Sequence, residues 1–331
     1  MYTCSFKDIT TFKVGGGIEE VVFLENATDI VALVSERVKH LKSWMVVGGG
    51  SNILASDDVY VGTVVVPRNQ KITFKKNNDV VLVTAGAGVE WDTLVQHTTD
   101  ESLWGLENLS GIPGTVGAAP IQNIGAYGVE VSETVESVRV YDTQQKNTKV
   151  LHNSELGFGY RTSMLKKNYP RFVVLEATFC LRTQSVPNTT YKDLKLFFGE
   201  STPTLQEIRE AVITIRKGKF PNLDEYGTAG SFFMNPIITH THLETLLQTY
   251  PTLPHFKTVG GFKISLAWVL DQVIHAKTMS VGGALVWDKQ PLVIATKKNA
   301  HAGDVRVLQQ QLQEKVFNKT NIKIFPEVLI L

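Results

Sequence analysis

The sequence predicts an α+β protein built of three consecutive regions. Strand and helix patterns alternate before residue 67, β-branched and aromatic segments dominate residues 80–183, and apolar residues recur at helical spacing from residue 204 onward. A chain of 331 residues is long enough for two or three domains of about 100–150 residues each. We therefore expect domains at 1–67, 68–203 and 204–331, and the C-terminal strand could return to the first of them.

The first region has the pattern of a small α/β unit. Ile18–Leu24 is typical of a strand, and Thr28–His40 is typical of a helix capped by its threonine. Trp44–Val47 is expected to form a second strand that leads directly into Gly48, and Gly62–Pro67 can add another.

The second region is expected to be mostly β-structure. Polar Arg68–Asp79 is either a hairpin or a boundary between lobes, and a short helix is expected near Trp91–Thr98. Gly105–Gly128 holds six of the 26 glycines and two prolines, which indicates a structured loop. The expected strands are Val80–Ala85, Thr134–Asp142, Thr148–His152 and Arg171–Thr183.

The third region mixes both element types. Leu205, Ile208, Val212 and Ile215 recur at helical spacing in Thr204–Lys217. Further helices are expected at Leu266–His275 and Asp304–Phe317, with strands near Ala284–Trp287, Leu292–Thr296 and Ile322–Leu331. Pro326 places the last strand at a sheet edge or at the end of its ladder.

Composition narrows the classes of partner. The chain is 43% hydrophobic and 20% charged, and no window approaches the roughly 20 apolar residues of a membrane span. Its 33 basic and 32 acidic residues leave a net charge of +1 without a basic run, so we expect no nucleic-acid or membrane partner. The N-terminus lacks a signal-peptide pattern, which predicts a cytoplasmic protein, and no obligate protein partner is indicated.

Metal and disulfide chemistry are not expected. Cys4 and Cys180 are isolated and lack CxxC or Cys/His ligand spacing. His240 and His242 lie two apart but have no third ligand nearby in the sequence.

The first glycine loop is Gly48–Leu54, with the sequence GGGSNIL directly after an expected strand. Glycines there can take positive φ and turn successive N–H groups toward one point, a nest that suits a pyrophosphate, and Ser51 and Asn52 can add donors. An ordinary strand-to-loop turn is the alternative. No GxGxxG motif occurs, so a Rossmann dehydrogenase is disfavoured and a dinucleotide would need another architecture.

The second glycine loop, Gly111–Gly128, is GIPGTVGAAPIQNIGAYG. Its residues have little bulk, so its backbone can approach a flat ring closely. Gln122, Asn123 and main-chain groups could supply amide partners for the polar edge of a flavin.

Together these motifs resemble the UDP-N-acetylenolpyruvoylglucosamine reductase (MurB) family. The resemblance covers the whole chain, because further motifs follow in the family's order. They are Thr10–Phe12 (TTF), Gly157–Ser163 (GFGYRTS), Ala229–Pro236 (AGSFFMNP) and Pro326–Val328 (PEV).

The resemblance implies an FAD-binding fold of the vanillyl-alcohol-oxidase (PCMH) type, with two flavin lobes and a C-terminal α/β substrate domain. It also implies reduction of the enolpyruvyl ether of UDP-N-acetylglucosamine by NADPH, through non-covalent FAD, to give UDP-N-acetylmuramate for peptidoglycan. The cofactor residues implied are Gly48, Gly49, Gly50, Ser51, Asn52, Gly114, Gly117, Ala118, Gln122, Asn123, Gly125 and Tyr127.

By the same resemblance Arg161, Ser231 and Glu327 are catalytic. Negative charge develops next to the substrate carboxylate during hydride addition, and a fixed cation and an acid would stabilise it, as Arg161 and Glu327 could do. Ser231 matches the family's proton donor. The alternatives are structural: an ion pair for Arg161, a helix cap for Ser231 and a solvated strand position for Glu327.

The resemblance assigns substrate binding to Tyr160, Tyr191, Lys219, Asn235 and Gln290. Tyr191 matches the tyrosine loop of the family's longer form, and a lysine beside amide donors suits a diphosphate. This chain has Ala118 and Ala119 in place of serines, Met234 in place of lysine and Leu329 in place of arginine.

Two other functions compete with this reading. Another flavoprotein of the same fold, oxidising a sugar or an alcohol, would leave the arginine, serine and glutamate motifs unexplained. No histidine lies in either glycine loop to tether the flavin covalently. A non-catalytic sensor of UDP-sugar or flavin would be expected to have lost catalytic groups that this chain keeps.

Overall fold

The computed structural model describes residues 4–331, which form two compact units. We call Ile18–Gly49 with Val61–Arg216 the central unit, and the described residues up to Gly17 with Gly50–Tyr60 and Lys217–Leu331 the terminal unit. Each of these two units is assembled from several segments of the chain. The expected division into three consecutive domains, with boundaries at residues 67 and 203, stays a prediction.

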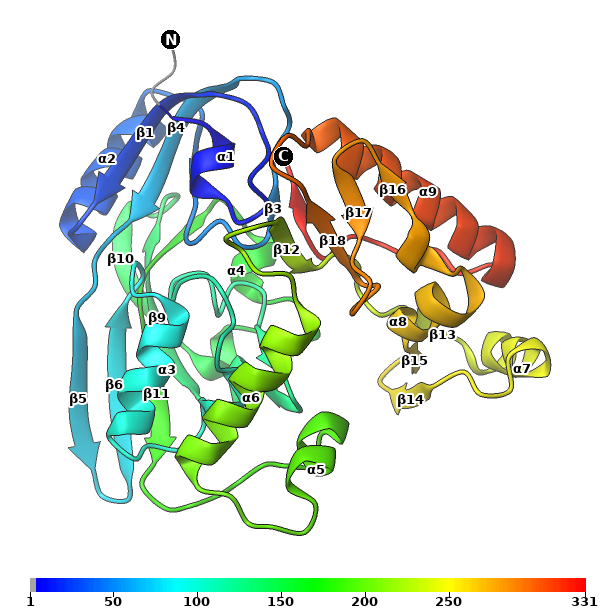
Figure 1. The fold of residues 1–331 in the computed structure, drawn as a ribbon. Coiled ribbons are helices and arrows are strands. Elements are labelled where there is room, and N and C mark those ends of the chain that lie inside the picture. The colour runs from blue at the N-terminus through cyan, green and yellow to red at the C-terminus, as the bar shows by residue number, and fades with distance from the viewer. Residues whose placement is uncertain (1–3) are drawn as a thin grey trace. The chain divides into compact units, whose positions relative to one another are not determined.

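The central unit contains the expected α/β unit, whose three strands pair in the order β1-β4-β2; Figure 1 shows β1 and β4 beside helix α2. Helix α2 (Ala27–Lys39) begins after Asn26, two residues before the expected cap Thr28. Its fully buried Ile30 and Val34 pack on this sheet and on residues of the neighbouring sheet. The strands are β1 (Ile18–Leu24), β4 (Tyr60–Pro67) and β2 (Trp44–Val46).

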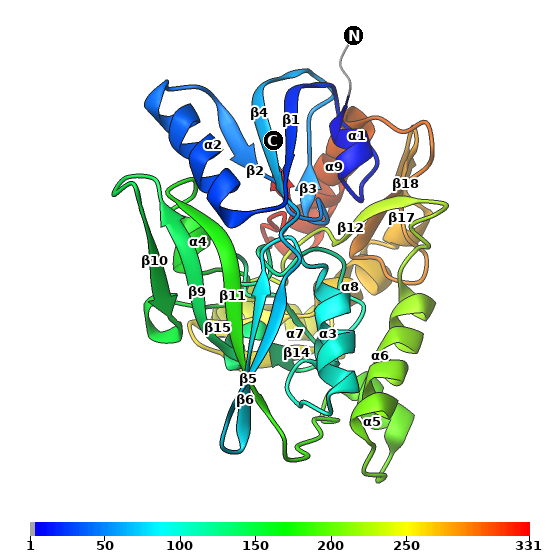
Figure 2. The ribbon, with the colours of Figure 1, turned by 90° about the vertical axis from the view of Figure 1, so that its left-hand side faces the viewer.

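A five-stranded antiparallel sheet forms the rest of this unit's framework, and Figure 2 shows its strands in the order β10-β9-β11-β6-β5. Segment 68–79 proves to be part of a hairpin, because β5 pairs with β6 and Asn78 adopts a positive φ of 53° in the turn. The strands are β5 (Ile72–Asn77), β6 (Val80–Gly86), β9 (Val135–Asp142), β10 (Asn147–His152) and β11 (Phe172–Arg182), so the four strands expected here are confirmed.

Helix α3 (Trp91–Asp100) covers one face of this sheet, where Trp91 packs edge-on against Phe179 with ring centroids 5.7 Å apart. The second glycine loop follows α3 and includes the short hairpin β7 (Gly125–Ala126) and β8 (Val129–Glu130). The other helices and turns are Glu107–Leu109, Val131–Glu133, Asn153–Glu155, α4 (Met164–Lys167), α5 (Lys192–Phe198) and α6 (Leu205–Lys219).

The terminal unit is built on a four-stranded sheet in the order β12-β18-β17-β16, against which helix α9 (Ala302–Thr320) packs. A smaller sheet, β13-β15-β14, lies beside α7 (His240–Thr249). Its strands are β12 (Gly227–Ser231), β13 (Ile237–Ile238), β14 (His255–Thr258), β15 (Gly261–Ile264), β16 (Ser280–Val281), β17 (Ala284–Val286) and β18 (Val293–Thr296). Helix α1 (Phe6–Ile9) opens this unit.

Two expectations for the terminal unit were wrong in part. Only Leu329–Ile330 (β19) of the expected strand 322–331 forms one, pairing in parallel with β3 (Ile53–Leu54), because Pro326 has no N–H to continue a ladder. The expected helix Leu266–His275 is a short α8 (Leu266–Trp268) followed by a π-helical turn, Val269–Val273. A 3₁₀ turn, Ala276–Thr278, comes next.

Some absences apply to residues 4–331. None of their helices is both long and apolar enough to cross a membrane. Within the same range no group of three or more histidine, cysteine or acidic side chains could hold a metal ion, and the two cysteines are not bonded to each other.

Candidate functional site

The first glycine loop packs directly against the second. A Cβ added at Gly48 would lie 2.4 Å from the Thr115 hydroxyl oxygen, and one added at Gly49 would lie 2.7 Å from the Gly114 Cα. Gly48 and Gly49 are therefore required by contact between the two loops, whereas the sequence predicted glycine there for its positive φ; of the three glycines only Gly50 adopts one, at 60°.

Two backbone donors of the first loop, at Gly48 and Gly49, remain available to a ligand. Among residues 4–331, no group accepts a hydrogen bond from the N–H of Gly48 or Gly49. Beside them the Thr115 hydroxyl is buried, and no described residue hydrogen-bonds it. Neighbouring N–H groups without acceptors are the donor set that suits a pyrophosphate, so the residues present fit FAD.

The second glycine loop is held by backbone hydrogen bonds, both to Ala87 and within the loop. Gly117 donates to the Ala87 carbonyl at 3.0 Å, and its missing Cβ would lie 2.6 Å from the Ala87 Cβ. Ala118 donates to the Thr115 carbonyl at 3.0 Å, and Gly114 adopts a φ of 126°. The loop thus depends on glycine both for tight packing and for its dihedral angles.

Tyr127 joins the second loop to the predicted tyrosine loop. Its ring packs edge-on against Tyr191 with centroids 5.5 Å apart, and Arg216 hydrogen-bonds its phenol. Burial, reinforced by the Asp193 charge and opposed by Arg216, raises the pKa of Tyr127 to about 12. The phenol therefore stays protonated at neutral pH. Burial and Asp193 also raise the pKa of Tyr191.

Helix α6 anchors the start of the same loop through residues that the sequence analysis missed. Arg209 makes a bidentate ion pair with Asp92 at 2.7 and 2.9 Å, and Asp92 also accepts from the Gly111 N–H at 2.6 Å. Arg216, two helical turns after Arg209, donates to the Gly111 carbonyl at 3.0 Å. The seven-residue spacing of the two arginines beside an apolar stripe was the signal that could have identified them.

Arg161 lies in a tight turn of the central unit. Gly159 and Thr162 exchange two backbone hydrogen bonds of 3.0 and 3.1 Å, and Arg161 adopts a φ of 55° between them. Its guanidinium donates to the Gly125 carbonyl at 3.0 Å and lies over the Tyr160 ring, 5.3 Å from the centroid. The structure therefore brings together Arg161, Tyr160 and Gly125, three of the predicted site residues.

Ser231 and Glu327 are brought together in the terminal unit. A bulge in β12 next to Gly230, whose φ is 74°, shifts the register with β18 just before Ser231. The Glu327 N–H donates to the carbonyl of Phe232, the residue after Ser231, at 2.8 Å. Asn52 of the first glycine loop donates its side-chain amide to the Glu327 carbonyl at 3.2 Å.

The remaining predicted residues lie in several elements. Ser51 is half-buried in the first loop, whereas Gly50 has a φ of 60° and packs against the backbone of Ile9. Gln122 is half-buried in the second loop. In the terminal unit Lys219 ends α6, the Asn235 side chain accepts from the Leu266 N–H at 3.0 Å, and Gln290 lies in the β17–β18 turn.

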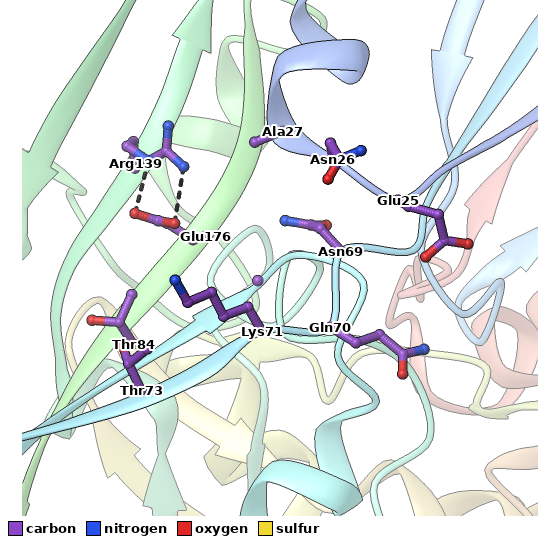
Figure 3. Close-up of a pocket in the computed structure, with 11 residues that line it drawn as sticks. Glu25, Asn26, Ala27, Asn69, Gln70, Lys71, Thr73, Thr84, Arg139 and Glu176 are labelled. Carbon is purple, nitrogen blue, oxygen red and sulfur yellow. Dashed lines mark hydrogen bonds and ion pairs between the residues drawn. The ribbon is translucent and has the colours of Figure 1, made fainter.

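A separate pocket of about 340 Å³ lies on the central unit, and none of the predicted site residues lines it (Figure 3). Its wall includes the ion pair between Arg139 and Glu176, at 2.7 Å. The Asn69 side chain donates to the Leu175 carbonyl at 2.8 Å and accepts from the Gly88 N–H at 3.0 Å. These side chains are engaged with one another and with the backbone, which is typical of a structural role.

Comparisons with known proteins agree with this architecture. A model of the FAD binding domain matches residues 18–148, and a model of the UDP-N-acetylenolpyruvoylglucosamine reductase C-terminal domain matches residues 222–331. The chain is 38% identical to UDP-N-acetylenolpyruvoylglucosamine reductase of Neisseria meningitidis serogroup A, covering 98% of this chain and 96% of that protein. It is 36% identical to the reductase of Ralstonia nicotianae, covering 97% and 96%.

A solved structure gives the same result. The crystal structure of MurB from Thermus caldophilus superposes with a TM-score of 0.70 at 25% identity, covering 99% of this chain and 97% of that one. The predicted fold class, an FAD-binding fold followed by a C-terminal domain, is confirmed.

Proposed function

The chain belongs to the UDP-N-acetylenolpyruvoylglucosamine reductase family, and we propose that Arg161, Ser231 and Glu327 are its catalytic residues. It is an FAD-dependent oxidoreductase, a UDP-N-acetylmuramate dehydrogenase. It uses NADPH to reduce UDP-N-acetylglucosamine enolpyruvate to UDP-N-acetylmuramate, a step of peptidoglycan synthesis.

The observation that best supports Ser231 and Glu327 is the backbone hydrogen bond that ties Glu327 to Phe232, the residue after Ser231. Residues 96 positions apart in the sequence are held together because Glu327 donates its N–H to the Phe232 carbonyl at 2.8 Å. Asn52 ties the first glycine loop to the same place through the Glu327 carbonyl. The proposed proton donor, the proposed acid and Asn52 of the first glycine loop thus lie together in the terminal unit.

The reaction adds a hydride and a proton across the carbon–carbon double bond of the enolpyruvyl group. FAD, after reduction by NADPH, would supply the hydride to the terminal carbon. Ser231 would then donate its hydroxyl proton to the carbon next to the carboxylate. A serine hydroxyl is a poor acid, so this step needs a strongly basic carbon and close positioning.

Arg161 and Glu327 would stabilise the charge that develops before protonation. Arg161 is held rigidly by Gly125 and Tyr160, so little reorganisation is needed when the negative charge appears. Glu327 is fixed on both sides of its peptide, through its N–H and its carbonyl. Fixed groups of this kind favour the transition state over the ground state.

We assign non-covalent FAD binding chiefly to backbone groups of the two glycine loops. The N–H groups of Gly48 and Gly49 would receive the pyrophosphate, with Gly50, Ser51 and Asn52 completing that loop. The second loop would contribute Gly114, Gly117, Ala118, Gln122, Gly125 and Tyr127.

For the UDP-sugar we propose Tyr160, Tyr191, Lys219, Asn235 and Gln290. Tyr191 is 45% exposed although its ring contacts Tyr127, so it can meet a ligand without leaving a packed core. We also propose a cytoplasmic location, because nucleotide sugars and NADPH are metabolites of that compartment.

The half-reactions test this proposal. The protein with bound FAD is reduced anaerobically with NADPH, and reoxidation is followed on addition of UDP-N-acetylglucosamine enolpyruvate. We expect Ser231→Ala to keep flavin reduction and to slow reoxidation about 10²–10⁴-fold, the usual contribution of a positioned proton donor. Equal losses in both half-reactions would assign Ser231 a structural role instead. Reoxidation of the wild type that does not depend on this substrate would refute the function.

A further inference from the structure

Asn123 is the most enclosed polar side chain of the second glycine loop, with no exposed surface. Its side-chain nitrogen donates to the Glu130 carboxylate at 2.7 Å and to the Gly159 carbonyl at 3.2 Å. Its side-chain oxygen accepts from the Ser132 N–H at 3.0 Å. Two acceptors and one donor fix the orientation of the amide, and both of its N–H donors are used within the protein.

The Gly159 carbonyl closes the turn that carries Arg161. The same oxygen accepts from the Thr162 N–H at 3.1 Å, so Asn123 is attached to the base of the turn. Positive φ is strained for a residue other than glycine, so Arg161 keeps its φ of 55° only because its surroundings hold it there. Lys166 supports the same turn by donating to the Arg161 carbonyl at 3.2 Å.

Asn123 itself occupies the left-handed region, with a φ of 50°. Asparagine tolerates this conformation better than other non-glycine residues. The position therefore combines a backbone shape and a three-bond amide that few other side chains can supply.

We propose that Asn123 is a positioning residue for Arg161, and that its amide links the flavin loop to the turn presenting the guanidinium. This inference rests on the proposed role of Arg161. It replaces the expectation that the Asn123 side chain hydrogen-bonds the flavin. The second glycine loop then has two roles: its backbone binds the cofactor, and its Asn123 side chain positions the Arg161 guanidinium.

The test compares the two half-reactions in Asn123→Ala. A displacement of about 1 Å in a charged group costs roughly 100-fold in rate, so we expect substrate-dependent reoxidation to slow about 10–100-fold. Flavin content and reduction by NADPH should stay within about twofold of wild type, because the backbone that meets the cofactor is unchanged.

A double-mutant cycle separates positioning from general loosening. In an Arg161→Ala background, Asn123→Ala should slow reoxidation no further, since the group it positions is gone. Asn69→Ala is the matched control, because Asn69 also bonds two backbone groups of this unit but none in 157–163. We expect it to leave the ratio of the two half-reaction rates unchanged.

An isosteric variant covers the case in which Asn123→Ala does not fold. This variant carries both Asn123→Asp and Glu130→Gln. The new glutamine can donate to the new aspartate, which restores the hydrogen bond between positions 123 and 130, while the bond to the Gly159 carbonyl stays lost. The reoxidation defect should persist, and Glu130→Gln alone should behave as wild type. Loss of FAD with equal slowing of both half-reactions would overturn the proposal in favour of a flavin contact. Additive effects of Asn123→Ala and Arg161→Ala would overturn it as well.

Discussion

Asp92 is the residue whose replacement most directly tests how the second glycine loop is anchored. Its carboxylate receives two bonds from Arg209 and one from the Gly111 N–H. The Arg209 side chain is only 6% exposed, whereas that of Asp92 is 40% exposed. Asp92→Ala would leave a buried guanidinium without its carboxylate and the loop's first N–H without its acceptor.

The structure sets the size of the effect. Removing one partner of a fully buried ion pair costs about 3–5 kcal/mol, and water entering from the exposed side of Asp92 should reduce this to about 2–3 kcal/mol. Asp92→Asn keeps an acceptor for Gly111 and one bond to Arg209, so about 1 kcal/mol is expected. In a unit of this size these losses correspond to melting-temperature decreases of about 4–10 °C and 2–4 °C.

The assay is thermal unfolding of the FAD-loaded protein, followed by circular dichroism and by the flavin fluorescence that appears on release. Flavin should be released before global unfolding in Asp92→Ala, because Gly111 opens the loop. The control is Asp100→Ala on the same helix, whose exposed side chain accepts a hydrogen bond from Gln96 at 2.7 Å. A melting temperature of Asp92→Ala within about 1 °C of wild type would refute the reasoning, as would an equal decrease in the control.

Two further predictions concern pH and the loop contact. The Arg171 guanidinium holds the pKa of the fully buried Asp142 well below its usual range. The ionised carboxylate therefore stabilises the fold at any pH above the unfolded-state pKa of about 4, and this stabilisation is lost as the pH falls below that value. The stability difference between wild type and Asp142→Asn, measured by urea unfolding, should therefore narrow from pH 5 toward pH 2, and a constant difference would contradict the linkage. Gly49→Ala would place a Cβ 2.7 Å from the Gly114 Cα and should weaken FAD binding at least about tenfold in a fluorescence titration, the loss expected when a loop backbone must move. Gly218→Ala, whose Cβ meets nothing within 4 Å, is its control and should leave FAD binding unchanged while stabilising helix α6 by about 0.4–1 kcal/mol.

Much of the secondary structure followed from local patterns. The strand Ile18–Leu24 was predicted to the residue, and α6 was placed within two residues, because both carry clear apolar periodicity. Strand β12 was not predicted, since its sequence GTAGS has neither β-branched repetition nor bulk. It forms a strand because it pairs with β18, which lies more than 60 positions later in the chain. The local sequence cannot indicate such a contact.

The candidate site divides in the same way. Motif resemblance predicts Arg161, Ser231 and Glu327 as catalytic, but the sequence could not show that Glu327 is tied to Phe232 and Asn52, which lie far away along the chain. It also missed Asp92 and Arg209, whose importance depends on meeting across two helices 117 positions apart.

The structure changes the reason why glycine is needed in the two loops. From the sequence, glycine was expected to supply positive φ in the first loop and room for a flat ring in the second. At Gly48, Gly49 and Gly117 the space that a side chain would need is filled by protein. What the first loop offers a ligand is the N–H groups of Gly48 and Gly49, which have no acceptor among residues 4–331. A cofactor site of this kind is specified by backbone direction, which any substitution at a loop contact disturbs. The Asn123 side chain instead bonds the neighbouring turn, so the loop that we propose for the cofactor can also position Arg161.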